Sequence, residues 1–121
     1  MKVVTQWQQD LTFTGTNEAG QSITIDCEGK AHSPMHMILM AVGACSSIDV
    51  VMILKKSRQD VTDCVCNLEA TRAETTPSVF TKIHAHYVVT GNNLKPSQIE
   101  RACSLSMDKY CSASLMLSKA V

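Results

Sequence analysis

An almost unbroken apolar stretch, "SPMHMILMAVGACSSIDVVMIL" at residues 33–54, constrains the fold of this chain of 121 residues more than any other feature. Ser33 is typical of a helix N-cap, and Pro34 is typical of the first helical position. Lys55 and Lys56 suit the C-terminal end of a helix dipole. The stretch therefore predicts a central helix over residues 34–57. Its apolar stripe consists of Ile38, Ala41, Val42, Cys45, Ile48 and Met52.

A helix of this length could also span a membrane. About 24 residues give roughly 36 Å at the usual helical rise, which is enough to cross a bilayer. However, polar side chains interrupt the stretch at four positions: His36, Ser46, Ser47 and Asp49. A helix buried on most sides at the centre of a globular fold is the favoured interpretation.

The segments on either side of this helix predict strands and shorter helices. Alternating residues and turn chemistry predict N-terminal strands within residues 2–27 and a hairpin over residues 62–91, with its turn at "TTPS". Pro96 opens a second helix, 96–109, and a short helical piece follows at 111–119. This order predicts one α+β domain over residues 1–121, with an antiparallel sheet and helices on one face.

Charge and composition exclude some classes of function. Eleven basic side chains balance eleven acidic ones, and only five aromatic residues are present. No basic excess or row of stacking aromatics favours nucleic acid as a partner. The first ten residues lack the apolar run and cleavage site of a signal peptide, so we expect a cytoplasmic protein that does not span a membrane.

Six cysteines are many for a chain of this length. Without a secreted context, most are expected to be reduced thiols in the core. Cys64-x-Cys66 and His84-x-His86 invite a zinc interpretation. A hairpin turn centred near Pro77 would instead place Leu68 and Ala70 opposite the histidines. The cysteines would then lie further along the sheet, with the histidines on the solvent side, and no metal is expected.

Cys45 and Cys111 each have neighbours that bear on the reactivity of a thiol, although a role as a small core residue stays open for Cys45. Asp49 lies one helical turn after Cys45, and a nearby carboxylate raises the pKa of a thiol. Cys111 lies where a new helical turn begins, where amide groups stabilise a thiolate. Cys45 lies about three turns into its helix, so we expect it to lack such amides. By spacing alone, the two cysteines form no motif.

The patterns "SPM…MILMAVGACSSIDVV…ILKK" and "DKYCSASLML" together resemble the OsmC/Ohr family, the osmotically inducible protein C and organic hydroperoxide resistance proteins. The resemblance is strongest to a small bacterial branch with SPM at the helix start. It implies an OsmC-like intertwined homodimer, with sheets wrapped around two long central helices.

The resemblance also implies a thiol-dependent reduction of organic hydroperoxides. Cys45 would be the peroxidatic cysteine and Cys111 the resolving one, and an external dithiol would reduce their disulfide. No metal or bound cofactor is implied. The residues expected in a pocket or around the thiols are Met35, His36, Ile38, Leu39, Val42, Asp49 and Met52.

Two departures from the family leave a second function open. The peroxidases carry a glutamate where this chain has Met35, and an arginine from the N-terminal part, where this chain has no arginine and Lys30 is a cation in roughly the right region. Relatives also usually add a closing strand after the second helix, so we expect a shorter sheet or a missing tail. The alternative is a module that binds an apolar small molecule or responds to redox state through an unactivated thiol pair. Purely structural thiols are the third possibility.

Overall fold

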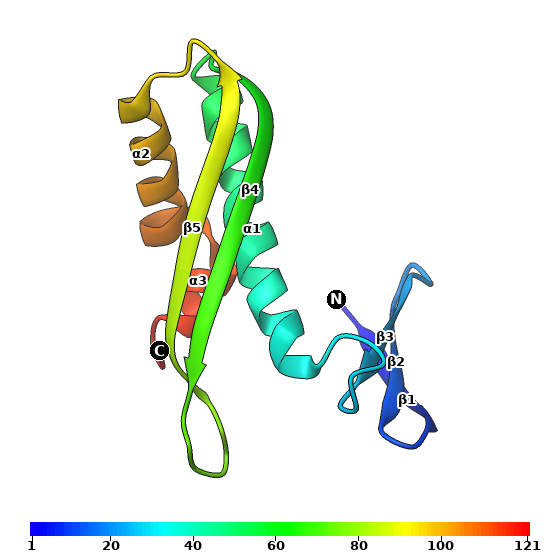
Figure 1. Ribbon diagram of the computed structural model, residues 1–121. Helices are drawn as coiled ribbons and strands as arrows, with labels where there is room; N and C mark the ends of the chain where they lie inside the picture. The colour runs from blue at the N-terminus through cyan, green and yellow to red at the C-terminus, as the bar shows by residue number, and fades with distance from the viewer. The chain divides into compact units, whose positions relative to one another are not determined.

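The computed structural model describes all residues from Met1 to Val121 and divides them into two compact units, residues 1–38 and 39–121. Both units combine antiparallel strands with helical segments (Figure 1), as the predicted α+β class requires. The prediction that the whole chain is a single domain stays a prediction.

The first unit contains a three-stranded antiparallel meander. Its strands β1 (Val3–Gln9), β2 (Thr12–Asn17) and β3 (Ser22–Asp26) pair in the order β1-β2-β3. The turn between β2 and β3 is closed by Asn17, whose side-chain oxygen accepts the N–H groups of Ala19 and Gln21. Every residue of β1 is exposed, so this sheet has little core of its own.

A buried carboxylate organises the chain after β3. Asp26 is 1% exposed and accepts hydrogen bonds from Thr12 Oγ1 at 2.8 Å, Glu28 N–H at 2.8 Å and Lys30 N–H at 2.9 Å. The N–H of Lys30 is the largest cause that lowers the pKa of Asp26, and burial opposes it. Sequence reasoning missed this residue, although an aspartate before "CEGK" is a typical start of a tight loop.

The central helix α1 (Pro34–Lys56) begins and ends close to the predicted bounds. Ser33 Oγ accepts the N–H of His36 at 3.1 Å, which is the predicted N-cap. By length and composition alone, α1 could cross a membrane, and only 28% of its most apolar window is buried within this chain. The core helix of a globular protein meets the same criteria. Here Val50 and Leu54 are fully buried against Ala102 and the hairpin, as in such a helix.

The second unit contains a long hairpin of β4 (Asp60–Arg72) and β5 (Phe80–Asn92). Its predicted register was wrong by one residue, because Asn67 lies opposite His86 and Glu69 lies opposite His84. Half-buried residues of β4 must pair with half-buried residues of β5, as in Leu68 with Ala85. The exposed histidines and the half-buried Cys64 and Cys66 therefore lie on opposite faces.

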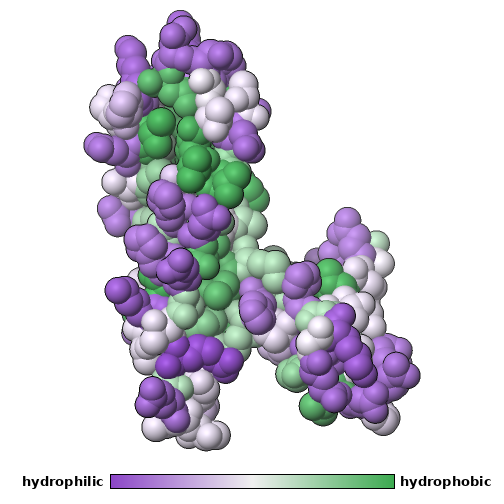
Figure 2. All heavy atoms as spheres, viewed as in Figure 1, coloured by the Kyte–Doolittle hydropathy of each residue, from purple (hydrophilic) through white to green (hydrophobic).

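The last third of the chain is less regular than predicted. The second helix α2 (Pro96–Leu105) stops four residues early, and a π-helical segment, η1 (Ser106–Tyr110), follows it. A final short helix, α3 (Ser112–Leu117), begins directly after Cys111. The helices of this unit pack on one face of the hairpin (Figure 1), and Figure 2 shows apolar side chains gathered between the hydrophilic ends of the unit.

Candidate active site

The structure brings Cys45 and Cys111 together, although 66 positions separate them in the sequence. Cys45 lies half-buried on α1, and Cys111 is completely buried at the N-cap of α3. The Cys111 side chain is close enough to raise the pKa of Cys45, and neither thiol is in a disulfide. Two thiols in contact are the minimum that a reversible disulfide requires.

The first turn of α3 directs hydrogen-bond donors at both sulfurs. The N–H of Ala113 donates to Cys45, and Ser114 donates to Cys111 Sγ from its N–H at 3.3 Å and from its Oγ at 3.0 Å. The expectation that Cys45 lacks amide donors was therefore wrong. The amide comes from a different helix from the one that carries Cys45, so position within α1 could not reveal it.

The electrostatic balance at Cys45 nevertheless favours the protonated thiol. The N–H of Ala113 is the largest single influence and lowers the pKa of Cys45, but the Cys111 side chain, burial and the charge of Asp49 together raise it above its usual value. The upward influence of Asp49 was predicted. No basic side chain is among the influences on the pKa of this thiol.

A network of polar side chains joins α1, β5 and η1 by hydrogen bonds. Tyr87 on β5 donates to Ser46 Oγ at 2.6 Å, and Ser46 donates to the Val42 carbonyl at 2.8 Å. Ser106 Oγ lies 3.1 Å from the Ser46 carbonyl and 3.0 Å from Asp49 Oδ2. Burial raises the pKa of Tyr87 to about 12, so its hydroxyl remains a donor at neutral pH. The carboxylate of Asp49 thus has the partner that its apolar surroundings require.

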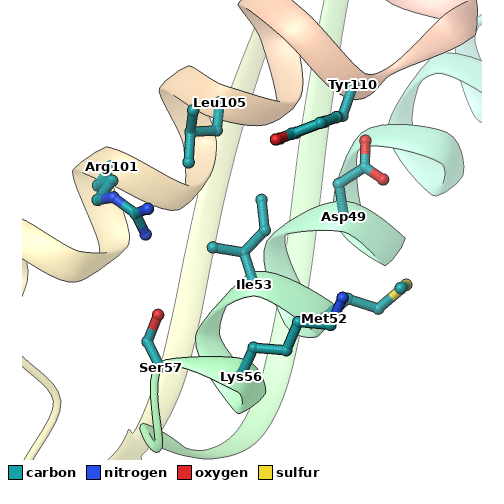
Figure 3. A pocket seen from close by; sticks show the side chains of 8 residues that line it. All are labelled: Asp49, Met52, Ile53, Lys56, Ser57, Arg101, Leu105 and Tyr110. Atoms are coloured by element: carbon teal, nitrogen blue, oxygen red, sulfur yellow. The ribbon is translucent and has the colours of Figure 1, made fainter.

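Within the second unit, three of the residues expected in a pocket or around the thiols line two different cavities. Asp49 and Met52 line a cavity of about 440 Å³ between α1 and α2, where Arg101 and Lys56 supply two cations (Figure 3). The residues around this cavity are Asp49, Met52, Ile53, Lys56, Ser57, Arg101, Leu105 and Tyr110.

Other members of the expected pocket lie elsewhere. Val42 is buried beside a second cavity of about 280 Å³, which Met107 and Ser114 also line. Leu39 is half-buried on α1. The remaining members belong to the first unit, namely Met35, His36 and Ile38. A common pocket with Cys45 stays a prediction.

The cation singled out in the N-terminal part, Lys30, is already paired. Its ammonium lies 3.4 Å from Asp10 Oδ2 within the first unit, and both side chains are exposed. His36 likewise has a local partner, because its Nδ1 lies 2.6 Å from Ser33 Oγ. Neither contact involves a thiol.

The other four cysteines differ in their surroundings. Cys64, Cys66 and Cys103 are half-buried, and burial is the main cause that raises the pKa of each thiol. Cys27 is exposed in the first unit. No group of three or more histidine, cysteine, aspartate or glutamate side chains is arranged to hold a metal ion. The surroundings of Cys64, Cys66 and Cys103 are those of small core residues.

Comparison with known proteins identifies relatives that cover the whole chain. The family model described as OsmC-like protein matches residues 27–121. Protein YhfA of Escherichia coli K12 is 50% identical, over all of this chain and 92% of its own length. A hypothetical protein from Aquifex aeolicus VF5 superposes with a TM-score of 0.90 at 32% identity, over 99% of this chain and 88% of that one.

A more distant structure shows the same fold. An organic hydroperoxide resistance protein OsmC from Legionella pneumophila superposes with a TM-score of 0.71, over 97% of this chain and 89% of that one. The two sequences are 15% identical, so this similarity concerns the fold alone.

Proposed function

Because the chain belongs to the OsmC-like family, we propose that it is a redox protein that reduces organic hydroperoxides through Cys45 and Cys111. The observation that carries the proposal is that these two thiols, one half-buried and one fully buried, are near enough for Cys111 to raise the pKa of Cys45.

The chemistry proceeds in three balanced steps. The Cys45 thiolate attacks the outer oxygen of the hydroperoxide, the O–O bond breaks, and the alkoxide leaves and takes a proton. Cys45 is then a sulfenic acid. The Cys111 thiol condenses with it, so that an S–S bond forms and water leaves. An external dithiol restores both thiols by two exchange steps and leaves as its own disulfide.

We propose that no metal or bound cofactor takes part, because the sulfurs carry the electrons in every step. The raised pKa of Cys45 means that only a small fraction of thiolate is available at neutral pH. We therefore expect turnover to increase as the pH rises above neutrality.

The experiment measures consumption of cumene hydroperoxide by the purified protein with dithiothreitol in excess. The expected result is turnover above the rate without protein, abolished in Cys45→Ser. In Cys111→Ser treated with cumene hydroperoxide in the absence of dithiothreitol, the expected product is a persistent sulfenic acid at Cys45, detected with dimedone. Consumption at the background rate at every pH from 7 to 9 would refute the proposal.

The raised pKa of Cys45 favours a second candidate function, a redox-responsive module without efficient turnover. Such a module would form the Cys45–Cys111 disulfide slowly and would not consume hydroperoxide catalytically. The two functions are separated by the number of hydroperoxide molecules consumed per protein. One molecule favours the module, and many favour the enzyme.

We also propose that the chain acts as a cytoplasmic homodimer. Large apolar side chains are exposed in both units, among them Val3 at 71% and Trp7 at 62% in the first, and Ile48 at 59% and Met52 at 50% in the second. Apolar surface of this kind on a globular chain marks an interaction site. A second copy of the chain is the partner that family membership favours.

A further inference from the structure

The hydroxyl of Ser114 lies between two sulfur atoms and has a single hydrogen to donate. Its Oγ is 3.0 Å from Cys111 Sγ and 3.4 Å from Met107 Sδ. Ser114 is 7% exposed, so water has little access to either acceptor. The hydroxyl hydrogen can therefore point at Cys111 Sγ or at Met107 Sδ, and the other sulfur then receives no hydrogen bond from this hydroxyl.

The neighbouring hydroxyl groups leave Met107 Sδ free to accept the hydrogen of Ser114. Ser46 uses its hydrogen on the Val42 carbonyl at 2.8 Å, so its oxygen is free to accept the hydrogen of Tyr87 at 2.6 Å. Tyr87 Oη also lies 3.3 Å from Met107 Sδ. Ser46 Oγ is nearer, and a hydroxyl oxygen accepts a hydrogen bond more strongly than a thioether sulfur, so Tyr87 donates to Ser46. Met107 thus remains available to Ser114.

We propose that Ser114 is a positioning residue that makes Cys111 the leaving thiolate whenever a Cys45–Cys111 disulfide is reduced. The inference rests on the proposed function, because it concerns the disulfide of that reaction. In the reduced pair the hydroxyl donates to Cys111, where a thiolate makes the bond charge-assisted. In the disulfide the same sulfur is a poorer acceptor, and the hydroxyl turns to Met107.

The burial of the two sulfurs fixes the direction of the exchange. Cys111 is 0% exposed, whereas Cys45 is half-buried, so an incoming thiolate reaches the Cys45 sulfur. A new S–S bond then forms between the reductant and Cys45, the Cys45–Cys111 bond breaks, and the electron pair leaves on Cys111. The second thiol of the reductant releases Cys45 as a thiolate. A stabilised leaving thiolate accelerates such an exchange.

The test compares the full-length protein with Ser114→Ala after oxidation with diamide. We expect dithiothreitol to reduce the Ser114→Ala disulfide about tenfold more slowly at pH 7. The equilibrium constant for reduction should fall about tenfold, which for a two-electron couple makes the potential about 30 mV more negative. A purely structural role for Ser114 would change the melting temperature without changing the potential.

Two further variants keep the result interpretable. Ser114→Thr retains a hydroxyl and should restore both the rate and the potential. Ser118→Ala removes a hydroxyl from the end of the same helix, where Oγ donates to the Leu115 carbonyl at 2.8 Å, and should match the wild type. An unchanged potential in Ser114→Ala would overturn the inference, and so would a Ser114→Thr variant that behaves like Ser114→Ala.

The same experiment separates this inference from the proposed function. Diamide forms the disulfide without any hydroperoxide. If diamide yields the disulfide and cumene hydroperoxide is not consumed, the peroxidase proposal fails while the role of Ser114 is still measured. If neither oxidant yields a Cys45–Cys111 disulfide, both proposals fail.

Discussion

At the level of single residues, Cys111 has a measurable influence on Cys45. The Cys111 side chain is the largest of the influences that raise the pKa of Cys45, and the N–H of Ala113 opposes it. Replacing Cys111 by alanine removes the side chain that raises the pKa of Cys45 and keeps the Ala113 N–H that lowers it. We therefore predict that Cys111→Ala lowers the pKa of Cys45. Alkylation of this thiol by iodoacetamide should then reach its half-maximal rate at a lower pH.

The size of this effect follows from the thiolate fraction. For each pH unit by which the profile moves down, the alkylation rate at pH 7 rises about tenfold, because the thiolate is the reactive form. The other cysteines are followed separately by mass spectrometry of the labelled peptides. If the pH profile of Cys45 alkylation does not move, or moves to higher pH, the Cys111 side chain does not raise the pKa of Cys45.

Asp26 is the second residue whose ionisation affects the molecule. Its pKa is lowered mainly by the N–H of Lys30, so the charged form stabilises the folded state. That contribution is complete above the ordinary range of an aspartate, about pH 4, and is lost as the pH falls through the lowered value. We predict that Asp26→Asn lowers the melting temperature by about 5 °C at pH 7. The difference from the wild type should shrink below about pH 4.

A matched variant is available in the same unit. Asp10 is exposed, and its φ of 46° suits asparagine as well as aspartate. Asp10→Asn should therefore leave the melting temperature nearly unchanged at every pH. Equal losses in the two variants would show that the buried carboxylate has no special part in the fold.

The thiol site could be predicted from the sequence only in part. The contexts of Cys45 and Cys111 identified both residues through their resemblance to a family. The donors at Ala113 and Ser114 were missed, because they depend on how α3 approaches α1 rather than on spacing along the chain. The arrangement of Cys111 followed three residues later by Ser114 does have the form of a helix cap. That pattern is the one signal that could have identified Ser114.

At the level of elements, Gly43 on α1 lies close to Leu68 on β4. A Cβ atom at this position would lie 2.6 Å from Leu68 Cδ1, so the leucine would have to turn away from α1. Overpacking of this kind costs about 1–3 kcal/mol. We predict that Gly43→Ala lowers the free energy of unfolding by that amount in urea titrations. Gly15→Ala is the control, because its new Cβ would lie 3.4 Å from Ile25 Cδ1, and it should cost much less.

In the hairpin, the alternation of apolar and polar residues predicted the faces of the strands but not their register. Alternation correctly assigned Cys64, Cys66 and Leu68 to one face, but the turn was centred one residue too late. A shift of one residue exchanges the two faces, and the half-buried residues themselves exclude it. The predicted register ignored this constraint. The π-helical segment after Leu105 had no comparable signal, because its residues are not distinguished from those of an ordinary helix by their periodicity.

At the level of the whole molecule, the exposed apolar surface is where we expect the proposed second copy of the chain to bind. Ile48 lies on α1 and is 59% exposed, although the helix around it is apolar almost from end to end. A helix that is apolar on all sides is normally buried on all sides. If two copies bury this helix between them, a charge at Ile48 must either leave the interface or lose its hydration.

We therefore predict that Ile48→Glu weakens self-association at least about thirtyfold, the effect expected of a central interface residue. Analytical ultracentrifugation over a range of micromolar concentrations should give a dimer for the wild type and largely monomer for Ile48→Glu. Ile48→Met keeps the apolar surface and should remain dimeric, while circular dichroism checks that each variant is folded. A wild type that sediments as a monomer would refute the dimer. A folded Ile48→Glu that dimerises like the wild type would place the interface away from this face of α1.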